Sequence, residues 1–302
     1  MIAKVAGKNK HCGFVAIVGR PNVGKSTLLN HILGMKLSIT SRKPQTTRHQ
    51  ILGVKTVDNT QTIYVDTPGI HQRRGSAINK YMNRAATSVL NDVDVILFVV
   101  QANKWTEEDQ AIVERFKKVS CPIILVVNKI DTLSSKKELL PIIEELSTYY
   151  DYTEILPVSA LNGINVEMLE QKVAPLLPDN EYIYPEDQVT DRSMRFLASE
   201  IIREKLIREL GQELPYTSTV SIDKYDDAPD IVHIHATIYV ESEGQKAIII
   251  GKKGSRLKSI GTKSREDISK MIETKVYLNL WVKVREGWSN DERALRGLGY
   301  GE

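Results

Sequence analysis

The chain has 302 residues, enough for two domains, and its 41% hydrophobic and 26% charged residues are typical of a globular protein. Its two cysteines, Cys12 and Cys121, lie in apolar runs, so we expect a reduced, cytosolic protein without a disulfide framework or a zinc site. No apolar stretch predicts a signal peptide after the basic residues 1–10, and none is long enough for a transmembrane helix.

The first motif follows an apolar, β-branched run at residues 12–18, which predicts a buried strand. The next eight residues match the phosphate-binding pattern G-x-x-x-x-G-K-[ST], and a helix-like run follows at 25–33. In this context we expect backbone N–H groups and Lys25 to meet phosphates and Ser26 to bind Mg²⁺, although a chance glycine-rich turn is the alternative. The expected loop comprises Gly19, Arg20, Pro21, Asn22, Val23, Gly24, Lys25 and Ser26.

The next segments predict a metal site and a γ-phosphate sensor. The polar, basic segment 41–49 contains Thr46 and Thr47, and we favour Thr47 as a further Mg²⁺ ligand over an ordinary loop hydroxyl. Asp66 ends a second strand-like run, where a carboxylate holds Mg²⁺, usually through water. The motif that Asp66 begins could be a plain turn. Because it follows a phosphate loop, we expect the Gly69 N–H to meet the γ-phosphate. This motif comprises Asp66, Thr67, Pro68 and Gly69, with Ile70 after it.

Two positions bear on hydrolysis. Ile70 stands where some GTPases carry a glutamine that orients the attacking water, so another group does this or intrinsic hydrolysis is slow. Asn22 could coordinate K⁺, which would supply positive charge where an arginine finger otherwise sits. The alternative is that Asn22 only tolerates an unusual backbone conformation.

Two later motifs predict a guanine base. An apolar run at 121–127 leads to Asn128, Lys129 and Asp131, and we expect Asn128 and Asp131 to choose guanine. The Asp131 carboxylate can accept from the ring N–H and the exocyclic amine of guanine. Because an unpaired buried polar group costs about 1–3 kcal/mol, this site should exclude ATP. We expect the Lys129 stem to pack over the base. After a strand at 155–158, Ser159 and Ala160 begin a common triplet in which the Ala160 N–H is expected to meet the guanine carbonyl.

The nucleotide pattern ends near Pro175, and residues 175–188, with three prolines and four acidic residues, predict a linker. Asp191 offers an N-cap for a helix with an apolar stripe from 194 to 210. The later segments predict an αββααβ order: strands at 216–225 and 231–240, an apolar run at 247–250, a Gly-Lys-Lys-Gly loop, a basic helix at 255–272 and a strand at 276–284.

A G-x-x-G loop in this order is the signature of a KH domain that binds RNA, although a lysine-rich turn on a solvated face is the alternative. Residues 251–285 carry ten basic and three acidic side chains, a net charge of +7, which suggests a polyanionic partner. Tyr277, Trp281 and Trp288 could stack on bases, but we expect each to serve in packing. The predicted RNA-binding residues are Gly251, Lys252, Lys253, Gly254, Arg256 and Lys258.

Together these motifs resemble the bacterial Era family of GTPases. The resemblance also includes Gln45-Thr46-Thr47-Arg48 and closing residues from Trp288 to Tyr300. It implies an α/β phosphate-loop GTPase domain, with a mostly parallel sheet and helices on both faces, followed by an α+β type II KH domain. The expected division is an N-terminal extension at 1–10, a GTPase domain at 11–178, a linker at 179–190, a KH domain at 191–287 and a tail at 288–302.

The resemblance further implies a GTP-hydrolysing switch, a monomer, that binds near the 3′ end of 16S ribosomal RNA and acts in assembly of the 30S subunit. It implies a cytoplasmic protein that partly associates with the inner membrane, with Mg²⁺ and K⁺ as the expected ions. An RNA-modifying GTPase is one rival, but we recognise no further catalytic motif after Pro175. A membrane-signalling GTPase whose basic domain binds anionic lipid is another, and the G-x-x-G loop argues against it.

Overall fold

The computed structural model describes residues 10–41, 46–69, 77–210 and 218–298. The chain divides into two compact units, the first comprising Met1–Ser38, Thr47–Gln72 and Met82–Asp191, and the second comprising Ile39–Thr46, Arg73–Tyr81 and Arg192–Glu302. None of the helices in the described ranges is long and apolar enough to cross a membrane.

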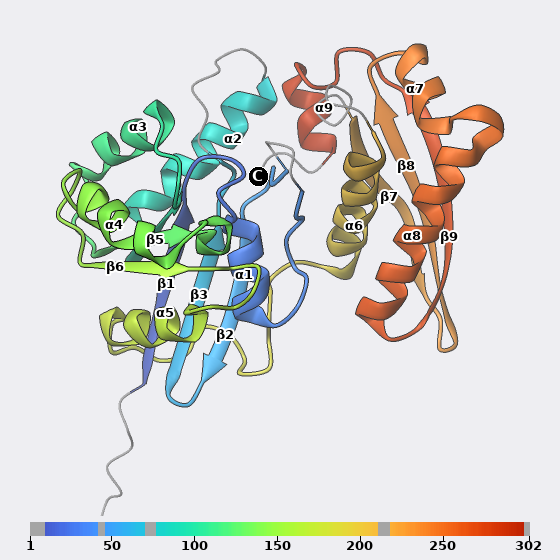
Figure 1. Cartoon of the computed structure of the whole chain (residues 1–302). Helices are drawn as coiled ribbons and strands as arrows, with labels where there is room; N and C mark the ends of the chain where they lie inside the picture. Colours follow the sequence, from blue (N-terminus) through green and yellow to red (C-terminus); the bar gives the residue numbers. More distant parts are fainter. Residues whose placement is uncertain (1–9, 42–45, 70–76, 211–217, 299–302) are drawn as a thin grey trace, which may run out of the picture. The chain divides into compact units, whose positions relative to one another are not determined.

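The first unit is built on a six-stranded sheet with the order β2-β3-β1-β4-β5-β6, in which only the β2–β3 pair is antiparallel. Helices lie on both faces of this sheet (Figure 1). A strand covered on both faces is apolar throughout, and the β4 residues from Val95 to Val100 are all buried. The strands are β1 (His11–Val18), β2 (Ile51–Val57), β3 (Thr60–Asp66), β4 (Val95–Gln101), β5 (Ile123–Asn128) and β6 (Glu154–Val158).

The helices of the first unit follow the strands in the alternation expected of a phosphate-loop fold. The predicted fold class is therefore confirmed. The α-helices are α1 (Lys25–Leu33), α2 (Ala77–Ser88, which begins in the second unit), α3 (Glu107–Phe116), α4 (Leu139–Ser147) and α5 (Val166–Val173). Short 3₁₀ turns are η1 (Val89–Asn91), η2 (Ile130–Thr132), η3 (Lys136–Glu138) and η4 (Ala174–Leu176).

The parallel strands bring the predicted motifs to one edge of the sheet. Ile17 of β1 is paired in register with Asp66 of β3, and Asn128 of β5 is paired with Gln101 of β4 and Val158 of β6. The segments that follow these strands therefore leave from the carboxyl edge, where ligands of open α/β sheets bind.

The second unit contains a three-stranded sheet with the order β7-β8-β9, antiparallel between β7 and β8 and parallel between β8 and β9. Its core joins Ala198 and Ile202 of α6, Ile260 and Ile268 of α8, and alternate residues of β8 such as Ile234. The elements follow the predicted αββααβ order: α6 (Met194–Glu209), β7 (Ser218–Asp227), β8 (Ile231–Val240), α7 (Glu243–Ile250), η6 (Lys252–Gly254), α8 (Ser255–Ile272), β9 (Lys275–Val284) and, in the tail, α9 (Glu292–Gly297).

The start of α6 differs from the prediction, and the packing of Trp288 agrees with it. The N-cap of α6 is Ser193, whose hydroxyl accepts from the Phe196 N–H at 3.3 Å, and not Asp191, which lies too far from the first turn to cap it. Trp288 is fully buried in a small cluster with Ala294 and Leu295, so the packing expected for it is confirmed.

Candidate nucleotide site and nucleic-acid groove

The predicted phosphate loop connects the end of β1 to the start of α1. Asn22 adopts a left-handed conformation with φ 64°, as does Gly24 with φ 105°. A Cβ atom on Gly24 would lie 2.3 Å from Asn128 Nδ2, so only glycine fits this close approach. The loop therefore reaches the N-terminus of α1, where free N–H groups favour an anion.

Lys25 is the buried cation of this loop. Its side chain is 6% exposed, and Nζ donates to the carbonyl oxygens of Gly19 at 2.9 Å and Arg20 at 3.0 Å. Burial lowers the pKa of Lys25 to about 8, and the nearby Asp66 charge opposes that shift. A phosphate in the loop would favour the charged ammonium in the same way.

The Arg20 side chain fastens the loop to α3. Its Nε donates to Asp109 Oδ2 at 2.9 Å, and its Nη2 donates to the Lys104 carbonyl at 3.3 Å. Asp109 is fully buried and also forms the capping box of α3 with Thr106. Burial raises the pKa of Asp109, while hydrogen bonds from Thr106 and the Arg20 charge oppose this shift. Because the guanidinium is committed to this tether, we expect the main chain of Arg20, and not its side chain, to face a phosphate.

Four oxygen-bearing side chains meet beside the loop. Asp66 is fully buried, and its Oδ2 accepts from Ser26 Oγ at 2.8 Å and from Ser38 Oγ at 2.7 Å. Thr47 Oγ1 lies 2.9 Å from Ser26 Oγ, so the favoured threonine adjoins the other predicted ligands. Nothing in the spacing of the sequence singled out Ser38.

This arrangement fits a magnesium ion. Within the described ranges, Asp66 Oδ1 is buried and accepts no hydrogen bond, and a buried carboxylate oxygen requires a partner. Mg²⁺ prefers a few oxygen ligands together with water and phosphate. Burial raises the pKa of Asp66, while the Lys25 charge and the two serine hydroxyls oppose this shift. No group of three His, Cys, Asp or Glu side chains that could hold another metal occurs among the residues described.

The motif after Asp66 lies against the phosphate loop. The Thr67 hydroxyl donates to the Ile17 carbonyl at 3.0 Å, so this side chain joins β3 to β1. A Cβ atom on Gly69 would lie 2.7 Å from Pro21 Cγ, which requires glycine at this position. Pro68, which lies between Thr67 and Gly69 in the sequence, is buried. Ile70 lies outside the described residues.

The Asn128 side chain connects two loops. Its Nδ2 donates to the Val23 carbonyl at 2.7 Å, and its Oδ1 accepts from the Ala160 N–H at 2.9 Å. The Ala160 N–H, for which a guanine carbonyl is the predicted partner, donates here to Asn128. Asn128 thus joins the phosphate loop to the loop after β6.

Asp131 and Lys129, the residues predicted to contact the base, follow Asn128 at the end of β5. The exposed Asp131 carboxylate accepts through Oδ1 from the fully buried Ser159 hydroxyl at 2.5 Å, which orients it. Lys129 has φ 65°, and its Nζ donates to the Asn22 carbonyl at 2.6 Å, so its stem runs beside the phosphate loop. Burial lowers the pKa of Lys129.

The predicted G-x-x-G loop of the second unit has an unusual backbone. Gly251, Lys253 and Gly254 have φ angles of 71°, 51° and 77°, and the side chains of Lys252 and Lys253 are exposed. Arg256 Nη1 donates to the Ile248 carbonyl at 2.6 Å, so this predicted RNA contact closes the end of α7.

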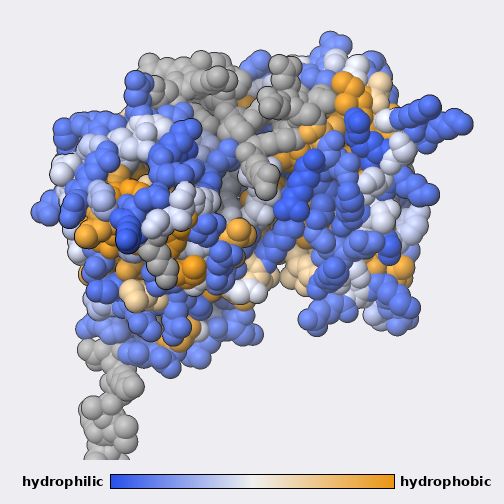
Figure 2. Space-filling view, in the orientation of Figure 1, coloured by the Kyte–Doolittle hydropathy of each residue, from blue (hydrophilic) through white to orange (hydrophobic). Residues whose placement is uncertain are grey.

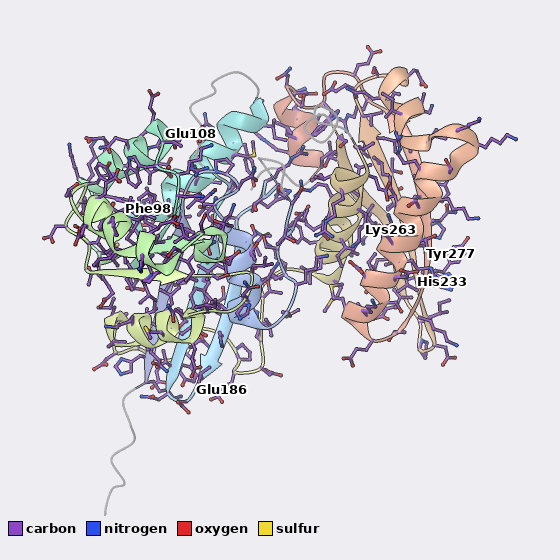
Figure 3. All side chains as sticks on the ribbon, in the orientation of Figure 1. Phe98, Glu108, Glu186, His233, Lys263 and Tyr277 are labelled. Carbon is purple, nitrogen blue, oxygen red and sulfur yellow. The ribbon has the colours of Figure 1, made fainter. Side chains whose placement is uncertain are left out.

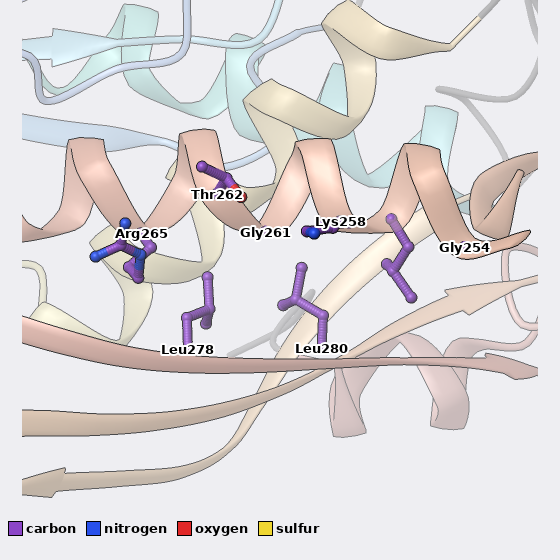
Figure 4. A pocket seen from close by; sticks show the side chains of 8 residues that line it. Gly254, Lys258, Gly261, Thr262, Arg265, Leu278 and Leu280 are labelled. Carbon is purple, nitrogen blue, oxygen red and sulfur yellow. The ribbon is translucent and has the colours of Figure 1, made fainter.

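A cavity of about 380 Å³ lies between α8 and β9 (Figure 4). We call it the α8–β9 groove. Leucine side chains form its apolar part and Lys258 and Arg265 its basic part, and the face around α8 is mainly hydrophilic (Figure 2). Of the predicted RNA residues, Gly254 and Lys258 line it. The other residues that line the groove were not among the predicted RNA-binding residues. Their helical spacing on α8 and their alternation on β9 are the signals that could have identified them: Leu257, Gly261, Thr262, Arg265, Leu278 and Leu280.

Comparisons with known proteins match both units. A family described as 50S ribosome-binding GTPase matches residues 14–129, and the KH domain family matches residues 213–289. The chain is 58% identical over 291 residues to GTPase Era of Pseudomonas aeruginosa, covering 96% of this chain and 95% of that protein. It is 59% identical over 289 residues to GTPase Era of Ectopseudomonas mendocina, covering 96% of this chain and 97% of that protein.

Two solved structures are similar over nearly the full chain. One is a variant of Aquifex aeolicus Era bound to GDP and AlF₄⁻, with a TM-score of 0.94, 42% identity and coverage of 97% of this chain and 100% of that one. The other, with the same values, is Era in complex with MgGDPNP and nucleotides 1506–1542 of 16S ribosomal RNA.

Proposed function

The chain belongs to the Era family of GTPases, and on that premise we propose that it binds 16S ribosomal RNA near the 3′ end and acts in assembly of the 30S subunit. Hydrolysis of GTP follows from the family. The observation that supports the RNA partner is the similarity, at a TM-score of 0.94, to an Era structure that holds nucleotides 1506–1542 of 16S ribosomal RNA. The α8–β9 groove in the KH domain offers a place for such a strand.

We infer the following roles in the nucleotide site. Lys25 contacts the β- and γ-phosphates, the loop from Gly19 to Ser26 supplies N–H donors, and Gly69 lies beside the γ-phosphate. Ser26, Thr47 and Asp66 hold Mg²⁺, and their contacts of 2.8 and 2.9 Å support this grouping. Mg²⁺ supplies positive charge to the phosphates when bound. Asp131, oriented by Ser159, selects guanine, while Asn128 holds the loops on either side.

Hydrolysis in this site is proposed to be slow and assisted by K⁺. Ile70 cannot orient water, and the Asn22 amide would hold K⁺ beside the phosphates. The left-handed backbone of Asn22 also fits the alternative, a residue chosen for its loop conformation. The two ideas differ in their dependence on K⁺.

For RNA, we propose that Lys252 and Lys253 contact phosphates of a strand in the α8–β9 groove. Gly251 and Gly254 have positive φ angles and no side chain, which would let the backbone of this loop approach the strand closely. A KH domain clamps about four nucleotides in this way. Lys258 and Arg265 lie at the groove and add positive charge, so the proposed RNA site includes the missed Arg265.

We further propose a cytoplasmic monomer that associates peripherally with the inner membrane face. The basic segment 251–285, with its net charge of +7, is the surface that would attract anionic lipid or RNA. We also propose that the GTPase domain spans residues 11–178 and the KH domain residues 191–287.

Crosslinking the protein to RNA in cells, followed by sequencing of the bound fragments, tests this function. We expect fragments from the 3′ end of 16S ribosomal RNA to be enriched, and the enrichment to be lost in a Lys252→Asp, Lys253→Asp double variant. We also expect depletion of the protein to cause accumulation of incomplete 30S particles. Fragments spread evenly over cellular RNA would contradict the proposed RNA partner.

A further inference from the structure

We propose that the KH domain carries a second RNA-contact surface on the face of its sheet opposite the helices. This surface, the outer platform, is formed by Tyr277 and Trp281 of β9 with His233 and His235 of β8, and it stacks unpaired bases of single-stranded RNA. The inference rests on the proposed RNA-binding function and extends it from the α8–β9 groove to a surface that the groove does not include.

The alternation of strand residues places these rings on one face. Val232, Ile234 and Ala236 of β8 are buried in the core, so the residues between them point to the other side of the sheet. In the β8–β9 register His233 is opposite Tyr277, and Trp281 is opposite Thr237. All four rings of the outer platform therefore lie on the face away from α6 and α8.

The two large rings are exposed. Tyr277 is 48% exposed and Trp281 is 42% exposed. The solvated face of such a sheet usually carries polar residues, because an exposed aromatic ring contributes little to the stability of the fold. Exposed rings that gather on one face of a sheet mark a contact surface.

The histidines hold the rings in a row. His235 stacks on Trp281 with ring centroids 5.5 Å apart and planes at 17°, and His233 lies 5.4 Å from Tyr277. Figure 3 labels His233 and Tyr277, whose side chains lie together on the neighbouring strands. His235 also lies 6.3 Å from Tyr277, so the contacts run through all four residues. Rings fixed by neighbours lose less conformational entropy when a ligand binds.

The charges around the outer platform favour a nucleic-acid strand. On β9 the exposed Lys275 and Lys283 share the face of Tyr277 and Trp281, one at each end of the row. The acidic residues of this face, Asp223 and Asp226, are on β7, on the other side of β8. Phosphates would therefore follow β9, while bases stack on the rings, as they do on the aromatic residues of RRM sheets.

The outer platform is continuous with the α8–β9 groove. Leu278 and Leu280 of β9 line the groove, while Tyr277 and Trp281 of the same strand point to the opposite face. Because β9 is an edge strand in the order β7-β8-β9, a strand leaving the groove reaches the platform by passing around one β-strand. Tyr277 and Trp281 are about 13 Å apart along the strand at ~3.3 Å per residue, so each can take its own base.

The test compares two single-stranded RNAs bound to the full-length protein. One has about four nucleotides, enough to fill a KH groove, and the other contains the same sequence within a strand roughly three times as long. In Tyr277→Ala and Trp281→Ala we expect affinity for the long RNA to fall about 5- to 150-fold, since stacking on a ring is lost. Affinity for the short RNA should not change.

A conservative variant gives the matched control. Trp281→Phe keeps an aromatic face, so it should retain most of the affinity for the long RNA. The long RNA should also quench the tryptophan fluorescence of the unsubstituted protein, and this quenching should largely disappear in Trp281→Phe. Because Tyr277 and Trp281 are exposed, the alanine variants should keep the thermal midpoint of the parent.

The outcomes separate this inference from the proposed function. If the Lys252→Asp, Lys253→Asp double variant binds the short RNA as tightly as the parent, the proposed RNA site in the α8–β9 groove is wrong. The test of the outer platform depends on the long RNA and is decided independently. Equal affinity of the alanine variants and the parent for the long RNA would overturn the platform. Equal losses of affinity for the short and the long RNA in the alanine variants would also overturn it. Loss of 30S binding in these variants without loss of RNA affinity would assign the surface to a protein partner.

Discussion

At the scale of single residues, several motif side chains have partners within the protein. Arg20 is bound to Asp109, Asn128 bridges Val23 and Ala160, and Arg256 binds the end of α7. Each of these contacts holds in place a loop that carries predicted ligand-binding groups. A substitution at such a position should alter binding through the shape of the loop.

Guanine selection should depend on the Asp131 carboxylate. In Asp131→Asn we expect GDP affinity to fall about 10- to 150-fold, because a hydrogen bond to a charged group contributes ~1.5–3 kcal/mol. Affinity for XDP should rise, since the new amide can donate to the carbonyl of xanthine. Titrations with GDP, XDP and ATP measure the change, and undiminished GDP affinity would remove Asp131 from the site.

The buried Arg20–Asp109 pair should support both stability and nucleotide binding. Asp109→Ala leaves the Arg20 guanidinium, 9% exposed, without its carboxylate, and removing one member of a buried pair costs about 3–5 kcal/mol. Denaturant unfolding should show this loss, and GDP should dissociate faster. The control is Glu107→Ala, an exposed acid in the same first turn of α3, which should cost no more than about 1 kcal/mol. A cost for Asp109→Ala no larger than that of the control would mean that the tether is unimportant.

Turnover should be faster in K⁺ than in Na⁺ if Asn22 helps to hold the ion. Asn22→Ala should remove the difference, while Asn22→Asp, which keeps an oxygen ligand, should retain part of it. Single-turnover hydrolysis in matched chloride salts measures this effect. Equal rates of the parent protein in the two salts would leave Asn22 as a loop residue only.

At the scale of elements, two loops with left-handed residues carry the proposed binding chemistry. In the phosphate loop Asn22 and Gly24 have positive φ angles, and in the G-x-x-G loop so do Gly251, Lys253 and Gly254. Both loops lead directly into a helix, α1 or α8. This geometry lets backbone groups approach a phosphate closely, because no Cβ atom stands between them at the glycines.

The G-x-x-G loop should act through its charge. Lys252→Asp with Lys253→Asp should weaken RNA binding and flatten the plot of log K against log salt by ~0.7 for each lost single-strand phosphate contact. GTP affinity should stay the same. The matched control is Lys117→Asp with Lys118→Asp, an equal change of charge on an exposed pair in the GTPase domain. Unchanged RNA affinity in the loop variant would mean that the loop is only a turn.

At the scale of the whole molecule, a nucleotide-dependent domain and an RNA-binding domain share one chain. The segments around Thr47 and Ile70 are expected to depend on the γ-phosphate, and a ligand shifts a conformational equilibrium only through its differential affinity for the two states. We therefore expect the bound nucleotide to control the affinity of the protein for RNA.

We predict that RNA affinity differs between the GDP-bound form and a form with a non-hydrolysable GTP analogue by about 5- to 150-fold, the usual range of coupling. By linkage, RNA should change the ratio of GTP to GDP affinity by the same factor. Titrating RNA against the apo and both nucleotide forms measures the first factor, and titrating nucleotide with and without RNA measures the second. Identical affinities in all three forms would leave two independent domains.

Much of the fold and of the site was predictable from local patterns. The helices expected at 25–33 and 255–272 are observed as Lys25–Leu33 and Ser255–Ile272, and the strand expected at 231–240 is Ile231–Val240. Hydrophobic periodicity and the glycines at each end specify such elements, because both act over a few residues. For the same reason the phosphate and base motifs were recognisable without any contact map.

The sequence by itself therefore determined the family, the order of elements and the chemical type of each motif. Only the tertiary structure decided which side chains meet. Arg20 and Asp109 are 89 positions apart, Ser38 and Asp66 are 28 apart, and the α8–β9 groove needs both a helix face and an edge strand. A local pattern carries no information about such partners, since they are set by the order and register of strands and by the packing of helices on the sheets.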